Sequence, residues 1–210
     1  IFGAKNEVVA FNLVLEAGTQ AVPQVSVRLL QLSNGLGSNI NYVSRSGNGV
    51  FNWVGAQIEP FYVRYVPIKG LSRLSYETYD ERHIPQKMRR PWSGAGIGSG
   101  TWNNRPNHDK YYPEIAVPLE LASPFSVNQN QNQSIWFDVY IPKTAAAGTY
   151  TGNVEVLESG LVTKIIPVEL IVRNFTLPDV PNSKTMLFLG YQNLGVRYLN
   201  NGYPAAGSAD

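Results

Sequence analysis

The stretch SIWFDVYIP, residues 134–142, switches between two kinds of side chain from one position to the next. One set is apolar throughout: Ile135, Phe137, Val139 and Ile141. The set between them is Trp136, Asp138 and Tyr140. Because successive side chains on a β-strand point to opposite faces, this period of two predicts a strand whose apolar set faces a core. Pro142 marks the end of the strand, since proline has no backbone N–H to donate to a neighbour.

The same period recurs on both sides of this stretch. Strands are expected over residues 7–17, 24–32, 58–68, 148–158 and 161–175. The last two form a hairpin across Ser159-Gly160. No segment has the apolar spacing and caps of an amphipathic helix. Short strands separated by Gly, Pro and Asn turns are typical of a sandwich. The sequence therefore predicts an all-β fold, an Ig-like antiparallel β-sandwich with one long irregular insert loop over about 77–112.

The chain divides into a sandwich over residues 1–180 and a linker and tail over 181–210. Leu177-Pro178 and Val180-Pro181 are extended X-Pro pairs typical of a linker. MLFLGY, residues 186–191, is a short apolar run such as a buried parallel strand has. The tail either folds back on the sandwich or opens a second domain that the sequence does not include. Ile1 begins within an expected strand, so we expect further chain upstream.

Composition excludes several classes of function. The chain has 210 residues, 43% of them hydrophobic and 15% charged, and a net charge of +2, which is too small to indicate a nucleic-acid partner. It has no cysteine, which excludes disulfides, thiol catalysis and cysteine-ligated zinc. No apolar run approaches the ~20 residues of a membrane span. The low charge and the abundant Asn, Gln, Gly and Thr suit an exported protein, one that is secreted, periplasmic or displayed at the cell surface.

Aromatic and amide side chains gather in the insert. We predict a carbohydrate-binding site there, because aromatic faces carry sugar rings while amides and carboxylates bind hydroxyls. The candidate residues are Trp92, Trp102, Asn103, Asn104, Asp109, Tyr111 and Tyr112. The alternative is that these aromatic residues pin a long loop to the sandwich. Trp53 and Trp136 lie nearer the expected strands and are expected to pack in the core.

Other chemistries have weaker support in the insert. GAGIGSG, residues 94–100, lacks the flanking strand and helix of a nucleotide loop. His83 and His108 lack the spacing of a zinc site. We expect no cofactor, although calcium could bind oxygen ligands. The possible calcium ligands are Asp80, Glu81, Asn103 and Asp109. Glycosidase chemistry needs two carboxyl groups ~5–9 Å apart, and the sequence does not show whether any acidic residues of the insert converge.

Three signatures together resemble a known domain. They are GAKNEVVAFNLVLEA near the start, YYPEIAVPLEL at 111–121, and SIWFDVYIPKTAAAGTYTGNVEV at 134–156 followed by PVELIVRNFTLPDVPNSKT. The chain resembles, over residues 3–190, the N-terminal β-sandwich domain of bacterial multidomain proteins similar to glycoside hydrolase family 123 and its uncharacterised relatives. It departs from that pattern in its longer, more basic insert and in Glu114, where aspartate is commoner.

The resemblance implies a division of labour within a longer protein. In such proteins the sandwich precedes a (β/α)₈ barrel, which holds the catalytic Asp-Glu pair; no residue here matches that pair, so no catalytic residue is assigned. We therefore expect a non-catalytic accessory domain that braces a catalytic barrel of the same polypeptide and contacts an oligo- or polysaccharide. The alternatives are a structural or adhesive Ig-like module without sugar binding, and a small self-contained hydrolase.

Overall fold

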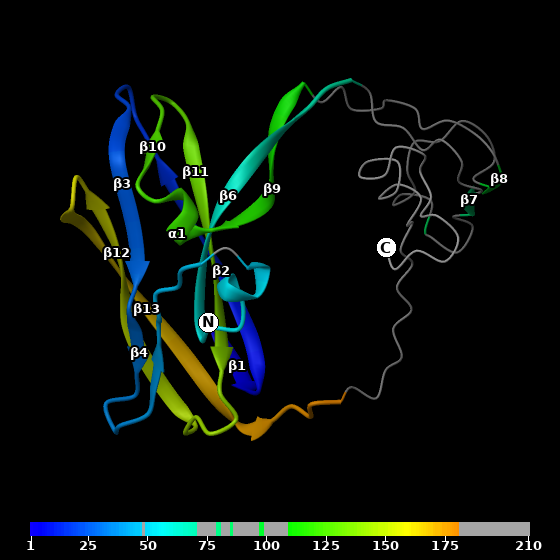
Figure 1. Cartoon of the computed structure of the whole chain (residues 1–210). Helices are drawn as coiled ribbons and strands as arrows, with labels where there is room; N and C mark the ends of the chain where they lie inside the picture. Colours follow the sequence, from blue (N-terminus) through cyan, green and yellow to red (C-terminus); the bar gives the residue numbers. More distant parts are fainter. Residues whose placement is uncertain (48, 71–78, 81–84, 86–96, 99–108, 181–210) are drawn as a thin grey trace, which may run out of the picture. The chain divides into compact units, whose positions relative to one another are not determined.

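The computed structural model describes residues 1–47, 49–70, 79–80, 85, 97–98 and 109–180 (Figure 1). The chain divides into two units, Ile1–Leu177 and Pro178–Asp210. The first unit contains two large β-sheets and a small two-stranded one, which confirms the predicted all-β sandwich. The described helices are short, a 3₁₀ turn η1 (Val50–Trp53) and a single α-helical turn α1 (Leu119–Ala122).

A four-stranded sheet has the strand order β2-β11-β6-β9. Its strands are β2 (Glu7–Glu16), β11 (Asn132–Ile141), β6 (Ile58–Ile68) and β9 (Lys110–Pro118). A seven-stranded sheet has the order β1-β13-β12-β3-β10, with β4 and β5 attached to β12. Its strands are β1 (Phe2–Lys5), β13 (Leu161–Thr176), β12 (Gly148–Glu158), β3 (Val22–Leu29), β10 (Phe125–Val127), β4 (Gln31–Ser33) and β5 (Asn39–Asn41).

Strand β11 supplies the centre of the core. It is paired on both sides, with β2 and with β6. The predicted inward set is 0% exposed at all of its positions: Ile135, Phe137, Val139 and Ile141. Phe11 of β2 stacks on Phe137 with ring centroids 4.8 Å apart. From the opposite sheet, Val27, Tyr150 and Val154 pack into the same cluster. The alternation in SIWFDVYIP therefore gives the strand and its orientation correctly.

The buried Tyr150 joins the sheet to a loop as well as filling space. Its ring is fully buried, and its hydroxyl donates to the Ala146 carbonyl at 2.9 Å and lies 2.6 Å from the Ser38 Oγ. A buried phenol needs such partners, because an unpaired hydroxyl in the core would be costly.

The predicted hairpin between β12 and β13 is confirmed. Ser159 and Gly160 both have positive φ values, 49° and 83°. A two-residue turn with φ above zero at both positions matches the right-handed twist of the strands it joins.

Strand pairing departs from the antiparallel prediction at one edge. Strand β1 pairs with β13 in parallel, whereas β2 lies in the other sheet. The chain changes sheets at Asn6, whose φ is 63°, a left-handed value that asparagine tolerates better than most residues. The Asn6 N–H donates to the Ile141 carbonyl at 2.8 Å, which fixes the corner.

The predicted insert begins and ends differently in the structure. Strand β9 starts at Lys110, so Tyr111 and Tyr112 belong to a strand and not to a loop. Two further short strands lie within the insert, β7 (Tyr79–Asp80) and β8 (Ile97–Gly98), and they pair antiparallel with each other. Sequence periodicity misses β7 and β8 because two residues are too few to show alternation.

Trp136 also differs from its prediction. It lies on the outward set of β11 and is 40% exposed, so it does not pack in the core. Its indole N–H donates to the Asp138 carboxylate at 2.8 Å.

Gly152 provides a test of how closely β12 approaches β4. A Cβ built on Gly152 would lie 2.1 Å from the Gln31 carbonyl oxygen, a backbone atom that cannot move by itself. We expect Gly152→Ala to lower the free energy of unfolding by ~1–3 kcal/mol, as overpacked cores do. Urea denaturation measures this. Gly18→Ala is the control, because a Cβ at exposed Gly18 meets nothing within 4 Å; equal midpoints for the two variants would contradict the expected clash.

Candidate functional site

A cleft opens at one end of the sandwich, and we call it the end cleft. Figure 1 shows that this end carries the last residues of β6, the first residues of β9 and the turn between β10 and β11. The cleft has a volume of about 580 Å³. Its lining residues are Tyr62, Arg64, Tyr65, Tyr111, Ser126, Val127, Asn128, Asn130, Gln131, Asn132 and Gln133.

Amide side chains dominate one wall of the end cleft. They come from the run NQNQNQ, residues 128–133. Backbone hydrogen bonds order this turn: the Asn130 N–H donates to the Gly18 carbonyl at 2.8 Å, and the Ala17 N–H donates to the Gln131 carbonyl at 3.0 Å. The run is therefore tied to the turn after β2, which fixes where its exposed amides stand.

Two members of this wall are held in defined orientations. Gln133 is buried, and its Nε2 donates to the carbonyls of Val63 and Ser134 at 2.8 and 2.9 Å. The Tyr65 hydroxyl donates to Asn132 Oδ1 at 2.9 Å. Because Oδ1 accepts from Tyr65, the Nδ2 donors of Asn132 remain available among the described residues.

Arg64 of β6 supplies the charge of the end cleft. Its side chain is exposed. Among the described lining residues there is no aspartate or glutamate, and within the described part of the chain Arg64 makes no ion pair. The lining therefore carries one positive charge beside neutral donors and acceptors.

The structure brings one of the predicted carbohydrate-binding residues into this cleft. Tyr111 lines it and is 71% exposed. Tyr112 and Asp109 are described but do not belong to its lining. Trp92, Trp102, Asn103 and Asn104 lie outside the described residues, so their prediction is not tested. Sequence reasoning missed Arg64, Tyr65 and the amides of 128–133; the density of amides in NQNQNQ was the signal that could have found the wall.

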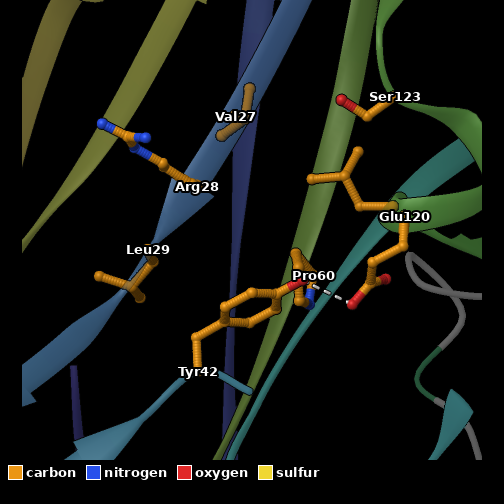
Figure 2. A pocket seen from close by; sticks show the side chains of 8 residues that line it. Val27, Arg28, Leu29, Tyr42, Pro60, Glu120 and Ser123 are labelled. Atoms are coloured by element: carbon orange, nitrogen blue, oxygen red, sulfur yellow. Dashed lines mark hydrogen bonds between the residues drawn. The ribbon is translucent and has the colours of Figure 1, made fainter. Parts of the chain in front are cut away.

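A second hollow, the side hollow, has a volume of about 190 Å³ (Figure 2). It is lined by Val27, Arg28, Leu29, Tyr42, Pro60, Leu119, Glu120 and Ser123. The Tyr42 hydroxyl donates to Glu120 Oε1 at 2.8 Å across it. Burial, reinforced by the hydrogen bond to the Glu120 carboxylate, raises the pKa of Tyr42 to about 12. Arg28 points away from this pair and binds Glu155, with Nε 2.6 Å from Oε2.

Neither hollow has the described residues for glycoside hydrolysis. That reaction needs two carboxyl groups facing each other, ~5–9 Å apart. The side hollow contains Glu120 as its one acidic residue among those described, and the described lining of the end cleft has none. The described lining of the end cleft offers hydrogen-bond donors and acceptors to a polar ligand.

Among the described residues, no group of three or more His, Cys, Asp or Glu side chains could hold a metal ion. Of the possible calcium ligands, Glu81 and Asn103 lie outside the described residues, so calcium binding stays a prediction. In the described part of the chain, no helix has the length and apolar character needed to cross a membrane.

Residues 86–158 match the family model of the glycoside hydrolase 123 N-terminal domain. The chain resembles that domain. The match covers β9, β10, β11 and β12, and therefore both the central strand of the core and the amide wall of the end cleft. No curated protein matches the sequence.

Two solved structures are similar to this chain, and the first of them shares its fold. One is a family 123 glycoside hydrolase from Clostridium perfringens, whose structural analysis concerned glycolipid glycan hydrolysis. It is 15% identical, with a TM-score of 0.51, and the match covers 84% of this chain and 22% of that chain. Another is AvmM, which catalyses macrocyclization in alchivemycin A biosynthesis. It is 9% identical to this chain, with a TM-score of 0.34, and the match covers 87% of this chain and 87% of that chain. The chain thus spans 22% of the length of the glycoside hydrolase that it resembles.

The Tyr42–Glu120 hydrogen bond makes a contribution to the free energy of unfolding that depends on pH. The pKa of Tyr42 is raised from 10.0 to about 12 in the folded protein. The contribution of the Tyr42 hydroxyl to the free energy of unfolding is therefore complete below pH 10. It is lost as pH rises through about 12, because the unfolded chain loses the hydroxyl proton at a lower pH than the folded protein does. We expect the stability advantage of the wild type over Tyr42→Phe to shrink across this range.

The measurement is the free energy of unfolding in urea at a series of pH values from 8 to 12, for both proteins. Taking the difference between them cancels the titration of the other tyrosines. Below pH 10 the variant should be less stable by ~1 kcal/mol, the usual value of one hydrogen bond. If the difference in free energy of unfolding between wild type and Tyr42→Phe stayed constant from pH 8 to 12, burial and the hydrogen bond to Glu120 would not raise the pKa of Tyr42, which would contradict the prediction.

Proposed function

We propose that this chain is the accessory β-sandwich of a glycoside-hydrolase-like bacterial protein that is secreted, periplasmic or displayed at the cell surface, and that it braces a catalytic barrel of the same polypeptide. The family match over residues 86–158 carries this proposal, because the matching model is that of an N-terminal domain. The shared fold covers 22% of a family 123 glycoside hydrolase, which leaves most of such an enzyme for other domains.

The outer face of the four-stranded sheet is the bracing surface in this proposal. Val8 and Val14 of β2 are 57% and 46% exposed, and Trp136 of β11, 40% exposed, lies diagonally opposite Val14. Cross-strand register places Val14 opposite Ser134 and Trp136 opposite Asn12 and Phe61. Burying these exposed apolar side chains against a partner would release ~25 cal/mol per Å², which supports this face as the docking surface.

The outer face of the seven-stranded sheet is different along β12. The outward residues there are Thr149, Thr151, Asn153 and Glu155. Glu155 is paired with Arg28 of β3. Threonines, an amide and a paired carboxylate are well solvated, so the part of this face along β12 gains little from a partner domain. This contrast holds for β12; on β1 and β13 of the same sheet, Phe2 and Ile165 are 66% and 61% exposed. We place docking on β2 and β11, where Val14 and Trp136 lie together on neighbouring strands.

Glycan contact is the second part of the proposal. An exposed tyrosine and ordered amides are the groups with which proteins hold sugar rings and hydroxyls. Tyr111 and the end cleft supply them without a carboxylate pair among the described residues, which suits binding and not cleavage. In this proposal the catalytic barrel of the same polypeptide cleaves the glycan.

The bracing role is tested in the full-length protein by Trp136→Gln combined with Val14→Gln. We expect calorimetry to show that the sandwich and the barrel unfold together in the wild type and separate into two transitions in the variant. Replacing apolar groups by amides would remove most of the docking energy of the outer face.

Thr149→Gln combined with Thr151→Gln is the matched control, since both residues are exposed on the other sheet. The control should keep the coupled transition. Coupling that survives the Trp136/Val14 change would contradict docking through the four-stranded sheet.

A further inference from the structure

We propose that the end cleft binds a saccharide that carries a singly charged anionic group, with Arg64 paired to the anion, the Tyr111 ring against a sugar ring, and the exposed amides of Asn128, Asn130, Gln131 and Asn132 bound to hydroxyls. The inference rests on the proposed function for its general ligand class, carbohydrate. The position of the site and the charge of the ligand come from the geometry of the cleft.

The size of the cleft fits one or two sugar rings. Its volume of about 580 Å³ lies within the ~300–1,000 Å³ typical of small-molecule sites. The side hollow, at about 190 Å³, is too small for such a ligand and is already bridged by the Tyr42–Glu120 hydrogen bond.

Arg64 sets the charge of the ligand. A guanidinium presents a planar fork of donors that matches a carboxylate or a sulfate in two parallel hydrogen bonds. Since no described carboxylate pairs with Arg64 and none lies in the described lining, its charge is not cancelled from within the cleft.

One cation also limits the charge of the ligand. Phosphorylated ligands, with about two negative charges, are usually bound by clusters of arginines. The described lining contains Arg64 as its one positively charged side chain. A group with a single charge, a carboxylate or a sulfate ester, is therefore the better match.

The amides provide the hydroxyl-binding wall. Each amide offers two donors and an acceptor, and a sugar hydroxyl donates and accepts in turn. Asn128 Nδ2 donates to Gln131 Oε1 at 3.1 Å, and Tyr65 holds Asn132, so these groups are arranged before a ligand arrives. Groups that are already ordered lose less conformational entropy on binding.

Tyr111 provides the apolar floor. It stands near the start of the edge strand β9 with 71% of its surface exposed, opposite Pro67 of β6. Because it is exposed and lines the cleft, its ring is accessible to a ligand held there. The electron-rich face of its ring suits the C–H groups of a pyranose.

The test uses the full chain and a glycan array that carries uronate-containing, sialylated, sulfated and neutral oligosaccharides. Array hits are then titrated by calorimetry against their neutral counterparts. We expect an anionic glycan to bind at least about tenfold more tightly than its neutral counterpart, with affinity that falls as salt rises. The carboxylated and sulfated arms distinguish the two sources of the charge.

Arg64→Gln should bring the anionic glycan down to the affinity of the neutral one, while Tyr111→Ala should weaken both by about tenfold or more. Arg173→Gln is the control, because Arg173 lies on β13 of the other sheet, with its guanidinium 5.6 Å from the centroid of the Phe2 ring. Circular dichroism and urea midpoints confirm that each variant folds.

Three outcomes would overturn the inference. Binding that is unchanged in both Arg64→Gln and Tyr111→Ala would place glycan contact elsewhere and leave the proposed function standing. Equal affinity for charged and neutral glycans would refute the role of Arg64. No binding of any glycan by the wild type would refute the site and the glycan contact together, whereas the bracing role, tested by unfolding, would be unaffected.

Discussion

The sandwich depends on the burial of one face of β11 against the opposite sheet. Phe137 and its neighbours in the inward set are excluded from solvent, and Tyr150 packs against them from β12. Every other strand of the four-stranded sheet is positioned directly or indirectly by pairing to β11. Because a shift of one residue would exchange the apolar and polar faces, this burial also fixes the register of β2 and β6.

That register is what builds the end cleft. Strand β11 begins at Asn132, so the amides that precede it are delivered to the end of the sheet at which β6 presents Arg64 and Tyr65. Residues far apart in sequence converge here because the strands that carry them are neighbours in the sheet. Core packing therefore determines where the residues of the end cleft lie, and substitutions in the core will shift them.

The sequence predicted those features that arise from local alternation. The long strands, the hairpin at Ser159-Gly160 and the inward set of β11 are all visible as a period of two or as a turn signal. It could not predict the change of sheets at Asn6, because the partner of β1 is β13, at the other end of the described sandwich. Nor does alternation say how well the outer face is covered, which is why Trp136 was misplaced.

The candidate site was predicted in part for a related reason. Tyr111 was recognised because an aromatic residue is conspicuous by itself. Arg64 was not recognised, because a single arginine in a strand does not indicate a binding site until its neighbours in space are known. In the run NQNQNQ, residues 128–132 are exposed, and backbone hydrogen bonds to the turn after β2 make them an ordered surface.

The parallel pairing of β1 with β13 has a mechanical consequence. The Ile1 amino group donates to the Glu169 carbonyl at 2.9 Å, and the Leu177 N–H donates to the Lys5 carbonyl at 2.9 Å. A tension applied between the two ends of the sandwich therefore runs along both strands in opposite directions and loads their ladder in shear. In that geometry the hydrogen bonds between β1 and β13 must break together and not one after another, so this pair resists a pull along the strands.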